Sequence, residues 1–385
     1  MKKSIFSILV AASIATTVIT VQSCRSNDDE EITVNTGNTM DPNNFQGEIK
    51  KGEILTLDPS KVYKMTGPVF VNDGATLVIP AGTRIEASGG TSSYLTVKQG
   101  GKIFANGTAS QPVVFTSLSA SPGSWGGLVI CGKAPINKGS SATAEVGNAT
   151  YGGSEANDNS GVLNYVKIEY AGAIFTADKE FNGLSLFAVG NGTSINHVAL
   201  LNGSDDGIEF FGGTVNVSNI ISIGNEDDAF DWTEGWNGTA TNIFTKRRAD
   251  GNGNRGIEGD NNSNNNNADP RSNPTIKNAT FIGATTGEAD GLKLRVGTHG
   301  NFDNIVLSGW KTGINLEHDA TLNHFNGNGK ITNVKFDNIT TEISAKNSSG
   351  NTVTTNNNTY TINNNASGAG NGTTTPTWAL GWSGQ

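Results

Sequence analysis

The apolar residues of the chain occur in short runs that are typical of β-strands. Residues 68–71, 75–79 and 83–87 are such runs, and β-forming apolar side chains alternate with other residues along them. Turn sequences separate the runs, namely residues 72–74 (Asn-Asp-Gly) and residues 80–82 (Pro-Ala-Gly). No long segment shows the period of an amphipathic helix. The pattern therefore predicts an all-β chain of many short strands.

A longer repeat recurs in the second half of the chain. A Gly or Ala is followed by an apolar residue, any residue and a second apolar residue, and successive copies begin 22, 27, 35 and 22 residues apart. The third copy lacks its last apolar residue. A spacing of 22 fits one solenoid coil per repeat, and the longer spacings fit loops inserted into a coil. The five copies begin at Gly207, Ala229, Gly256, Gly291 and Gly313.

An asparagine marks a second position in each repeat. Asparagine tolerates a positive φ and can bond to neighbouring backbone, so it suits a corner between two short strands. Stacked coils would bring these asparagines into a ladder. His197 lies 22 residues before the first of them, which predicts a corner position for this histidine as well. The asparagines are Asn219, Asn242, Asn278, Asn304 and Asn333.

These periods predict a single-stranded right-handed parallel β-helix over residues 46–345. One coil cannot bury its apolar residues alone, but stacked coils share a continuous core. A β-propeller needs roughly 40 to 45 residues per blade, and a leucine-rich horseshoe needs a leucine pattern that the chain lacks. Alternation along the strands points the apolar triplet residues inward and the middle residues outward, in one column. That column is Glu209, Asp231, Glu258, Lys293 and Asn315.

The N-terminal residues have the order of an export signal. Lys2 and Lys3 precede an apolar stretch over residues 5–21, and small residues precede Cys24. The sequence Val-Gln-Ser-Cys resembles a lipoprotein signal-peptidase box, which implies removal of residues 1–23 and lipidation of Cys24. Residues 24–45 then form an acidic flexible tether. Its residues 28–31 resemble the signal that sends Bacteroidetes lipoproteins to the cell surface, and a plain solvated tether explains them equally well.

Four tryptophans raise the question of sugar binding. Residues 346–385 are an Asn- and Thr-rich tail, which is expected to be poorly ordered or to cap an edge. Trp378 and Trp382 in this tail can fold back and close the open end of the β-helix, or can serve as aromatic platforms for sugars. Trp236 and Trp310 are candidate ligand-binding residues in loop-like sequence, although a Trp that covers a coil edge is the commoner case.

Composition narrows the choice of partners and of chemistry. The net charge is −9 and no basic cluster exceeds residues 246–248, which argues against nucleic acid. Only Cys131 remains once Cys24 carries a lipid, so no intramolecular disulfide is expected. Cys131 lies in an apolar run and is expected to be buried and inert. The four histidines are too irregularly spaced for a zinc site.

Carboxylates gather along one edge of the outward column. Asp206 and Asp228 precede the outward residues by three positions, and other acidic residues lie in the loops just before them. Coils about 4.8 Å apart bring such charges close together. A Ca²⁺ ion with roughly six to eight oxygen ligands relieves the repulsion, and ion pairs with Arg255, Lys293 and Arg295 are the alternative. The candidate calcium ligands are Asp205, Asp206, Glu209, Glu226, Asp227, Asp228, Asp231, Glu258 and Asp260.

The same face also raises an enzymatic alternative. It resembles the face of β-helical polysaccharide lyases, in which calcium acidifies the proton beside a uronate carboxyl group and a basic residue removes that proton. This resemblance implies Lys293 and Arg295 as candidate bases. A likeness to polygalacturonases, which need an acid and a base around the scissile bond, fails because the segment with His299 follows residues 293–295, the reverse of that family's order.

Five segments of the chain carry a resemblance to a known family, namely residues 67–71, 124–130, 205–213, 227–232 and 270–276. They resemble an exported right-handed β-helix family that is common in Bacteroidetes and similar to the pectate-lyase-like superfamily. The resemblance runs from about residue 50 to the end. It implies the fold but adds little about activity, because the family is largely without an assigned reaction and a fold does not determine a function.

The sequence thus favours a lipid-anchored protein of the outer membrane that is exposed at the cell surface. We expect its β-helix face to bind a glycan or another surface component, with calcium as the expected cofactor. The alternatives are a calcium-dependent polysaccharide lyase or related carbohydrate-active enzyme, and a structural or adhesion protein. We expect a monomer or a member of a surface complex.

Overall fold

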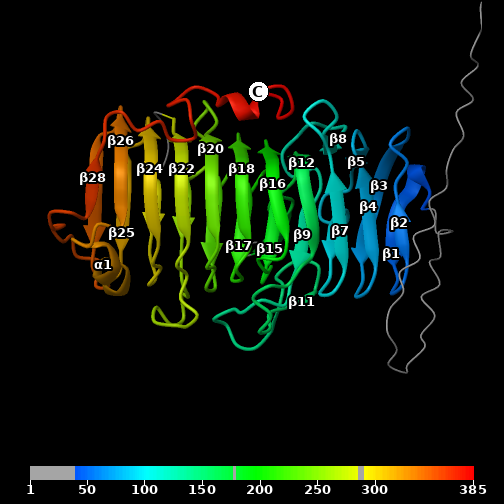
Figure 1. Ribbon diagram of the computed structural model, residues 1–385, viewed down its shortest axis with the longest axis horizontal. Helices are drawn as coiled ribbons and strands as arrows, with labels where there is room; N and C mark the ends of the chain where they lie inside the picture. Colours follow the sequence, from blue (N-terminus) through cyan, green and yellow to red (C-terminus); the bar gives the residue numbers. More distant parts are fainter. Residues whose placement is uncertain (1–39, 177–178, 285–289) are drawn as a thin grey trace, which may run out of the picture. The chain divides into compact units, whose positions relative to one another are not determined.

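A computed structural model describes residues 40–176, 179–284 and 290–385. Short strands are stacked coil on coil from β1 (Phe45–Ile49) to β28 (Tyr360–Ile362), as Figure 1 shows. Within these residues, parallel pairings join 24 strands into one system, and two antiparallel strand pairs lie outside it. The prediction of an all-β, right-handed parallel β-helix is confirmed. The expected signal peptide, Cys24 and the acidic residues 28–31 lie outside the described residues.

The strands fall into three parallel columns, one of which carries the apolar triplets found in the sequence. Its strands run in chain order and each pairs with the next. They are β6 (Leu95–Val97), β9 (Leu128–Cys131), β15 (Leu184–Phe187), β17 (Ile208–Phe211), β19 (Phe230–Thr233), β21 (Ile257–Gly259), β23 (Asp290–Leu294), β25 (Thr312–Glu317) and β27 (Thr341–Lys346).

The other two columns begin as separate strands and continue as long bent strands. The start of β3 (Val62–Val71) pairs with β5 (Arg84–Ala87), and its end pairs with β6. The separate strands are β2 (Ile54–Thr56), β4 (Thr76–Pro80), β5 (Arg84–Ala87), β7 (Lys102–Asn106) and β8 (Val113–Ser117). The bent strands are β12 (Gly161–Glu169), β16 (Ser194–Leu201), β18 (Asn216–Ile223), β20 (Thr239–Lys246), β22 (Thr275–Ile282), β24 (Asn301–Ser308) and β26 (Ile331–Asp337).

Each bent strand from β16 to β26 turns its corner at a residue with a positive φ, as the sequence predicts. The φ is 52° at His197 and 56° at Asn219, and the other four asparagines of the repeat lie between 53° and 59°. The side chains form a ladder along the stack. Asn242 Nδ2 donates to Asn219 Oδ1 at 3.0 Å, and Asn304 Nδ2 donates to Asn278 Oδ1 at 2.9 Å. The ladder therefore satisfies amide groups that a corner would otherwise leave to solvent.

The triplet register is also confirmed. Ile208 pairs with Phe230, and both side chains are fully buried in the main core. Their neighbours Glu209 and Asp231 pair with each other on the opposite face of the same strands. Alternation along a strand thus places apolar side chains inside the coil and carboxylates outside it.

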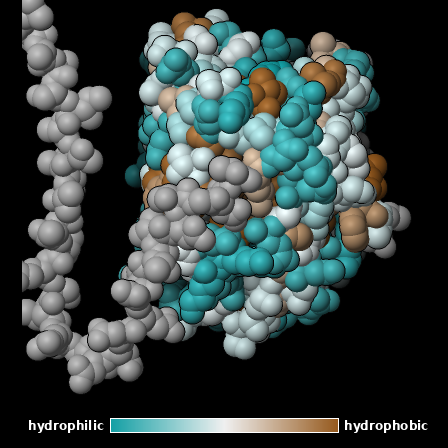
Figure 2. All heavy atoms as spheres, turned by 90° about the vertical axis from the view of Figure 1, so that its right-hand side faces the viewer, coloured by the Kyte–Doolittle hydropathy of each residue, from teal (hydrophilic) through white to brown (hydrophobic). Residues whose placement is uncertain are grey.

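Two insertions and three short helices complete the described chain. One insertion, residues 132–160, contains β10 (Ala142–Thr143) and β11 (Thr150–Tyr151), and the second contains β13 (Ile174–Thr176) and β14 (Lys179–Glu180). The helices are η1 (Pro42–Asn44), α1 (Asp319–Phe325) and η2 (Thr377–Ala379). None of these described helices has the length and hydropathy needed to cross a membrane. On the side shown in Figure 2, hydrophobic side chains form small separate patches.

The C-terminal residues differ from the expected end cap. β28 pairs with β26, so the parallel ladder continues beyond residue 345. The last segment then runs back along the stack above β18 and β20 (Figure 1), and Trp382 packs on Ile221 and Phe244 of these strands. The prediction that the two tail tryptophans close the open end is therefore wrong: they cover the outer side of several coils. Trp382 is 2% exposed and offers no platform for a sugar.

Candidate functional site

The acidic residues of the outward column lie on three adjacent strands. Glu209 on β17, Asp231 on β19 and Glu258 on β21 are register partners, and Lys293 on β23 continues the row. Parallel strands lie about 4.8 Å apart, so each carboxylate has another directly beside it. The predicted column is therefore present.

The aspartates in the preceding turns join the column through the backbone. Asp206 accepts a hydrogen bond from the backbone N–H of Asp228 at 2.8 Å, and Asp228 accepts one from the backbone N–H of Arg255 at 2.7 Å. Both side chains are buried, with 6% and 2% exposed. These two aspartates thus tie one coil to the next.

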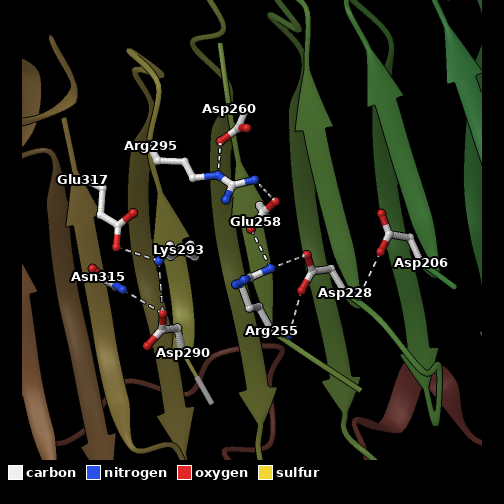
Figure 3. A network of polar contacts seen from close by, with 10 residues as sticks. All are labelled: Asp206, Asp228, Arg255, Glu258, Asp260, Asp290, Lys293, Arg295, Asn315 and Glu317. Carbon is white, nitrogen blue, oxygen red and sulfur yellow. Dashed lines mark hydrogen bonds and ion pairs between the residues drawn. The ribbon is translucent and has the colours of Figure 1, made fainter. Parts of the chain in front are cut away.

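One end of the column is neutralised by basic side chains, as Figure 3 shows. Arg255 lies 3.2 Å from Asp228 and 2.6 Å from Glu258, and Arg295 binds Glu258 and lies 2.9 Å from Asp260. At this end, the carboxylates are therefore neutralised by ion pairs, which the sequence offered as the alternative to calcium. They also engage Asp260, which the sequence placed among the calcium ligands.

Lys293 belongs to the same neutralised end. Its ammonium lies 2.7 Å from Glu317 and 3.9 Å from Asp290, which also accepts a hydrogen bond from Asn315 at 2.8 Å. Glu226 points to a different partner, Arg248, at 3.3 Å. The structure therefore does not bring Glu226 into the carboxylate cluster.

The other end of the column differs, because none of its carboxylates has a basic partner in the described part of the chain. No ion pair there involves Asp205, Asp206, Glu209, Asp227 or Asp231. The amide of Asn182 donates to Glu209 at 2.7 Å. Asp231 Oδ1 is buried and has no hydrogen-bond partner among the described residues. An unpartnered buried carboxylate oxygen is costly unless a proton or a cation reaches it.

These carboxylates are close enough to share a cation. Three overlapping groups each place one oxygen per residue within 4.8 Å of the others. Hard oxygen donors at this density suit Ca²⁺, which binds carboxylates at about 2.3–2.6 Å. The groups are Asp205, Asp206 and Asp227; Asp206, Glu209 and Asp231; and Asp228, Asp231 and Glu258.

Burial and mutual repulsion raise the pKa values of this cluster. Burial, followed by the charges of neighbouring carboxylates, raises the pKa of Asp206 and Asp231 well above the ordinary value. Burial and the contact with the carboxyl group of Glu180 raise the pKa of Asp205 to about 9. Burial and the charge of Glu234 raise the pKa of Glu145 to about 7. Without a cation, part of the cluster must hold protons at neutral pH.

The insertion of residues 132–160 is fixed beside the cluster. Tyr151 donates to Glu234 at 2.7 Å, and Lys138 lies 2.9 Å from the same carboxylate. The insertion also packs Val146 and Tyr151 on β9 and β15 in a small apolar cluster of its own. That cluster buries Cys131, whose pKa burial raises to about 12, in agreement with the predicted inert thiol.

Sequence patterns missed three acidic members of the site. Glu234 follows the apolar triplet of its own coil by two residues, so its place near the column could have been predicted from the repeat. Glu145 and Glu180 lie in the two insertions, where no repeat predicts which side of the coil a residue faces. Their positions follow only from tertiary packing.

The candidate aromatic residues Trp236 and Trp310 are inside the protein. Trp236 is fully buried, stacks on Phe210 with ring centroids 3.9 Å apart, and donates to the carbonyl of Val215 at 3.1 Å. Trp310 is 2% exposed and donates to the carbonyl of Phe281 at 2.9 Å. Neither ring can stack on a sugar, so their assignment as ligand-binding residues is wrong. Both belong to the core, which is the commoner role of such residues.

Comparison with known proteins agrees with this architecture. Residues 47–383 match the model of a pectate-lyase-like β-helix domain. The chain belongs to this family. No curated protein matches it. Among solved structures, the enzymatically active domain of tailspike protein 2 from bacteriophage CBA120 is similar, with 13% identity, a TM-score of 0.23, and coverage of 77% of this chain but 42% of the tailspike chain. The family match, and not this neighbour, supports the fold.

Proposed function

We propose that this β-helical protein binds calcium at the unpaired end of its acidic column and uses that face to bind a glycan or another surface component. The observation that carries the proposal is the group formed by Asp206, Glu209 and Asp231, whose oxygens lie within 4.8 Å of one another without a basic partner among the described residues. A bound cation supplies the missing charge and leaves coordination positions for hydroxyl or carboxylate oxygens of a ligand.

Calcium should stabilise the protein through these carboxylates. A ligand that binds only the folded state at about 100 times its Kd adds about 2.7 kcal/mol, so we expect calcium to raise the melting temperature measured in chelator. Asp231→Asn should remove most of that rise. The matched control is Asp337→Asn, which changes an exposed residue whose contact is with Ser308. Equal calcium responses in the two variants, or no response in the wild type, would contradict the proposal.

Lyase chemistry receives less support from the geometry. Lys293 and Arg295, the candidate bases, are both held in ion pairs at the neutralised end of the column. Burial lowers the pKa of Arg295, but the charges of Asp260 and Glu258 outweigh it and raise the pKa above its ordinary value. A group that holds its proton this firmly is a poor general base. Binding is therefore the function that we propose.

The cellular location remains part of the proposal. We propose that Cys24 carries a lipid that anchors the protein in the outer membrane with the β-helix at the cell surface; the support is the signal-like order of residues 1–24. Cys24→Ser should move the protein from the membrane fraction to the soluble fraction, as measured by fractionation and immunoblotting. Cys131→Ser is the control and should leave the protein with the membranes. If Cys24→Ser also stayed there, the anchor would have to be a different one.

A further inference from the structure

A polar trough lies beside the acidic column, past the ends of the same strands. It consists of two adjacent cavities of about 420 Å³ each, which share Arg271 and His299 in their linings. The first is lined by turns that follow β17, β19 and β21 and contains one carboxylate, Asp269; the second is lined by turns that follow β21 and β23 and by α1. Volumes of this size are typical of small-ligand sites.

Among the described residues, the lining of the second cavity includes cations and amides but no carboxylate. Its charged residues are Arg271 and Lys330, and neither is in an ion pair within the described part of the chain. Asn267, Asn323 and Asn328 line the same cavity. This chemistry is opposite to that of the acidic column, and it favours an anionic group with hydrogen-bonding hydroxyls around it.

The side chains of the trough are held in place before any ligand arrives. Arg271 donates to the carbonyl of Gly297 at 3.2 Å and to Asn267 at 2.9 Å. His299 stacks on His324, with ring centroids 3.9 Å apart and an interplanar angle of 9°. Groups that are already ordered lose little conformational entropy on binding.

The turns that carry these residues are themselves anchored. Trp232, deep in the core, donates to Thr298 at 3.0 Å, and Gly297 N–H donates to Thr321 of α1 at 2.9 Å. Burial, His324 and Arg271 together lower the pKa of His299 to about 4. Its imidazole is therefore neutral at pH 7, and the positive charge of the cavity comes from Arg271 and Lys330.

We propose that the second cavity of this trough binds the anionic groups, carboxylate or sulfate, of an acidic glycan, with Arg271 and Lys330 as the residues that bind the charge. This inference rests on the proposed function for the binding of a glycan, and it adds that the glycan is acidic. An acidic polymer can contact the column through calcium and the trough through direct ion pairs. The trough itself needs no metal.

The test compares three oligosaccharides of equal length: a uronate, a sulfated and a neutral one. Binding is measured by calorimetry in chelator with the wild type, Lys330→Glu and the control Lys277→Glu, which changes an exposed lysine that lines neither cavity. We expect the wild type to bind at least one acidic sugar and not the neutral one. Lys330→Glu should weaken that binding by about tenfold or more, because a charge-assisted contact becomes repulsive. Lys277→Glu should have little effect.

The remaining outcomes separate the two proposals. Arg271→Gln should also weaken binding, and an unchanged melting temperature shows that the variant is folded. Binding that needs calcium and is unaffected by Lys330→Glu would overturn the trough and leave the acidic column as the site. Binding that persists in chelator, in a protein whose melting temperature does not respond to calcium, would support the trough and contradict the calcium proposal. Equal affinity for neutral and acidic sugars would overturn the trough.

Discussion

The carboxyl groups of Asp205 and Glu145 differ from ordinary surface carboxyls because each is buried next to another acidic residue. Burial raises the pKa of Asp205 to about 9 and that of Glu145 to about 7, helped by Glu180 and Glu234 respectively. A raised pKa in the folded state means that the folded protein binds these protons more tightly than the unfolded chain does. Such groups favour folding at low pH, and this contribution is lost as the pH rises through the folded pKa.

We therefore predict that the calcium-free protein becomes less stable between about pH 5 and about pH 8. In chelator the melting temperature should fall by about 2–5 °C over this range, and calcium should remove most of the fall because the cation stabilises the ionised carboxylates. Glu145→Gln should flatten the profile measured in chelator, whereas Asp337→Asn should leave its slope unchanged. A wild-type melting temperature that rises over this range without calcium would contradict the prediction, because it would mean that the folded protein binds fewer protons than the unfolded chain.

Side-chain burial also explains the wrong assignment of Trp236. In the sequence it follows Glu234 and Gly235, a setting that resembles a surface loop. In the structure the turn folds inward, and the indole stacks on Phe210 and lies beside Phe230 and Trp232. A residue just past a strand can face either the core or the solvent, and strand alternation does not extend to it. Local sequence therefore cannot decide its direction.

At the scale of a strand, the corner asparagines show what the repeat specifies. The backbone at Asn242 has a φ of 59°, which is unfavourable for residues with a Cβ by about 1–2 kcal/mol. Asparagine reduces this cost through local hydrogen bonds, and here its side chain also bonds to Asn219 below it and accepts from Asn278 above it at 3.3 Å. One residue type thus serves both the turn and the stacking.

These two contributions can be separated at Asn242. Asn242→Ala loses the ladder and keeps the strain, so the free energy of unfolding should fall by about 1–2 kcal/mol. Asn242→Gly loses the ladder but relieves the strain, and it should cost less than the alanine variant. Denaturant titration measures both, with Thr241→Ala, at the preceding position of β20, as a control. Equal costs for alanine and glycine would mean that the positive φ contributes nothing to stability.

The predictable part of this protein is the part that repeats. Register follows from spacing, so the inward residues, the outward carboxylate column and the corner positions, His197 included, could all be predicted from the sequence. The insertion of residues 132–160 and the described residues of the second insertion, 174–176 and 179–180, do not repeat, and their contributions to the site depend on contacts between coils distant in sequence. The division of the column into an end with ion pairs and an end without them could not be predicted from the sequence either. Spacing placed Arg255 and Arg295 nearby but could not show which carboxylates they bind.

At the scale of the whole described fold, the C-terminal segment links coils that are far apart in sequence. Asn304, whose own ladder position is on β24, accepts hydrogen bonds from the backbone N–H groups of Ser367 and Gly368 at 3.0 and 3.1 Å. Farther along, Trp382 packs edge-on against Tyr165 of β12, with ring centroids 5.4 Å apart. The segment thus spans the coils from β24 to β12. It covers apolar side chains that the outer sides of β16, β18 and β20 would otherwise expose.

Removal of residues 377–385 should uncover this surface without dismantling the acidic site. Loss of a buried Trp typically costs about 3–5 kcal/mol, so the truncated protein should melt at a lower temperature and bind more of a hydrophobic dye such as ANS. The control deletes only Gly384 and Gln385, which are exposed. Calcium should still raise the melting temperature of both truncated proteins, because no calcium-ligand candidate lies in the segment. A truncated protein that melts like the control would mean that β16, β18 and β20 are stable without their cover, and that the segment stabilises little beyond itself.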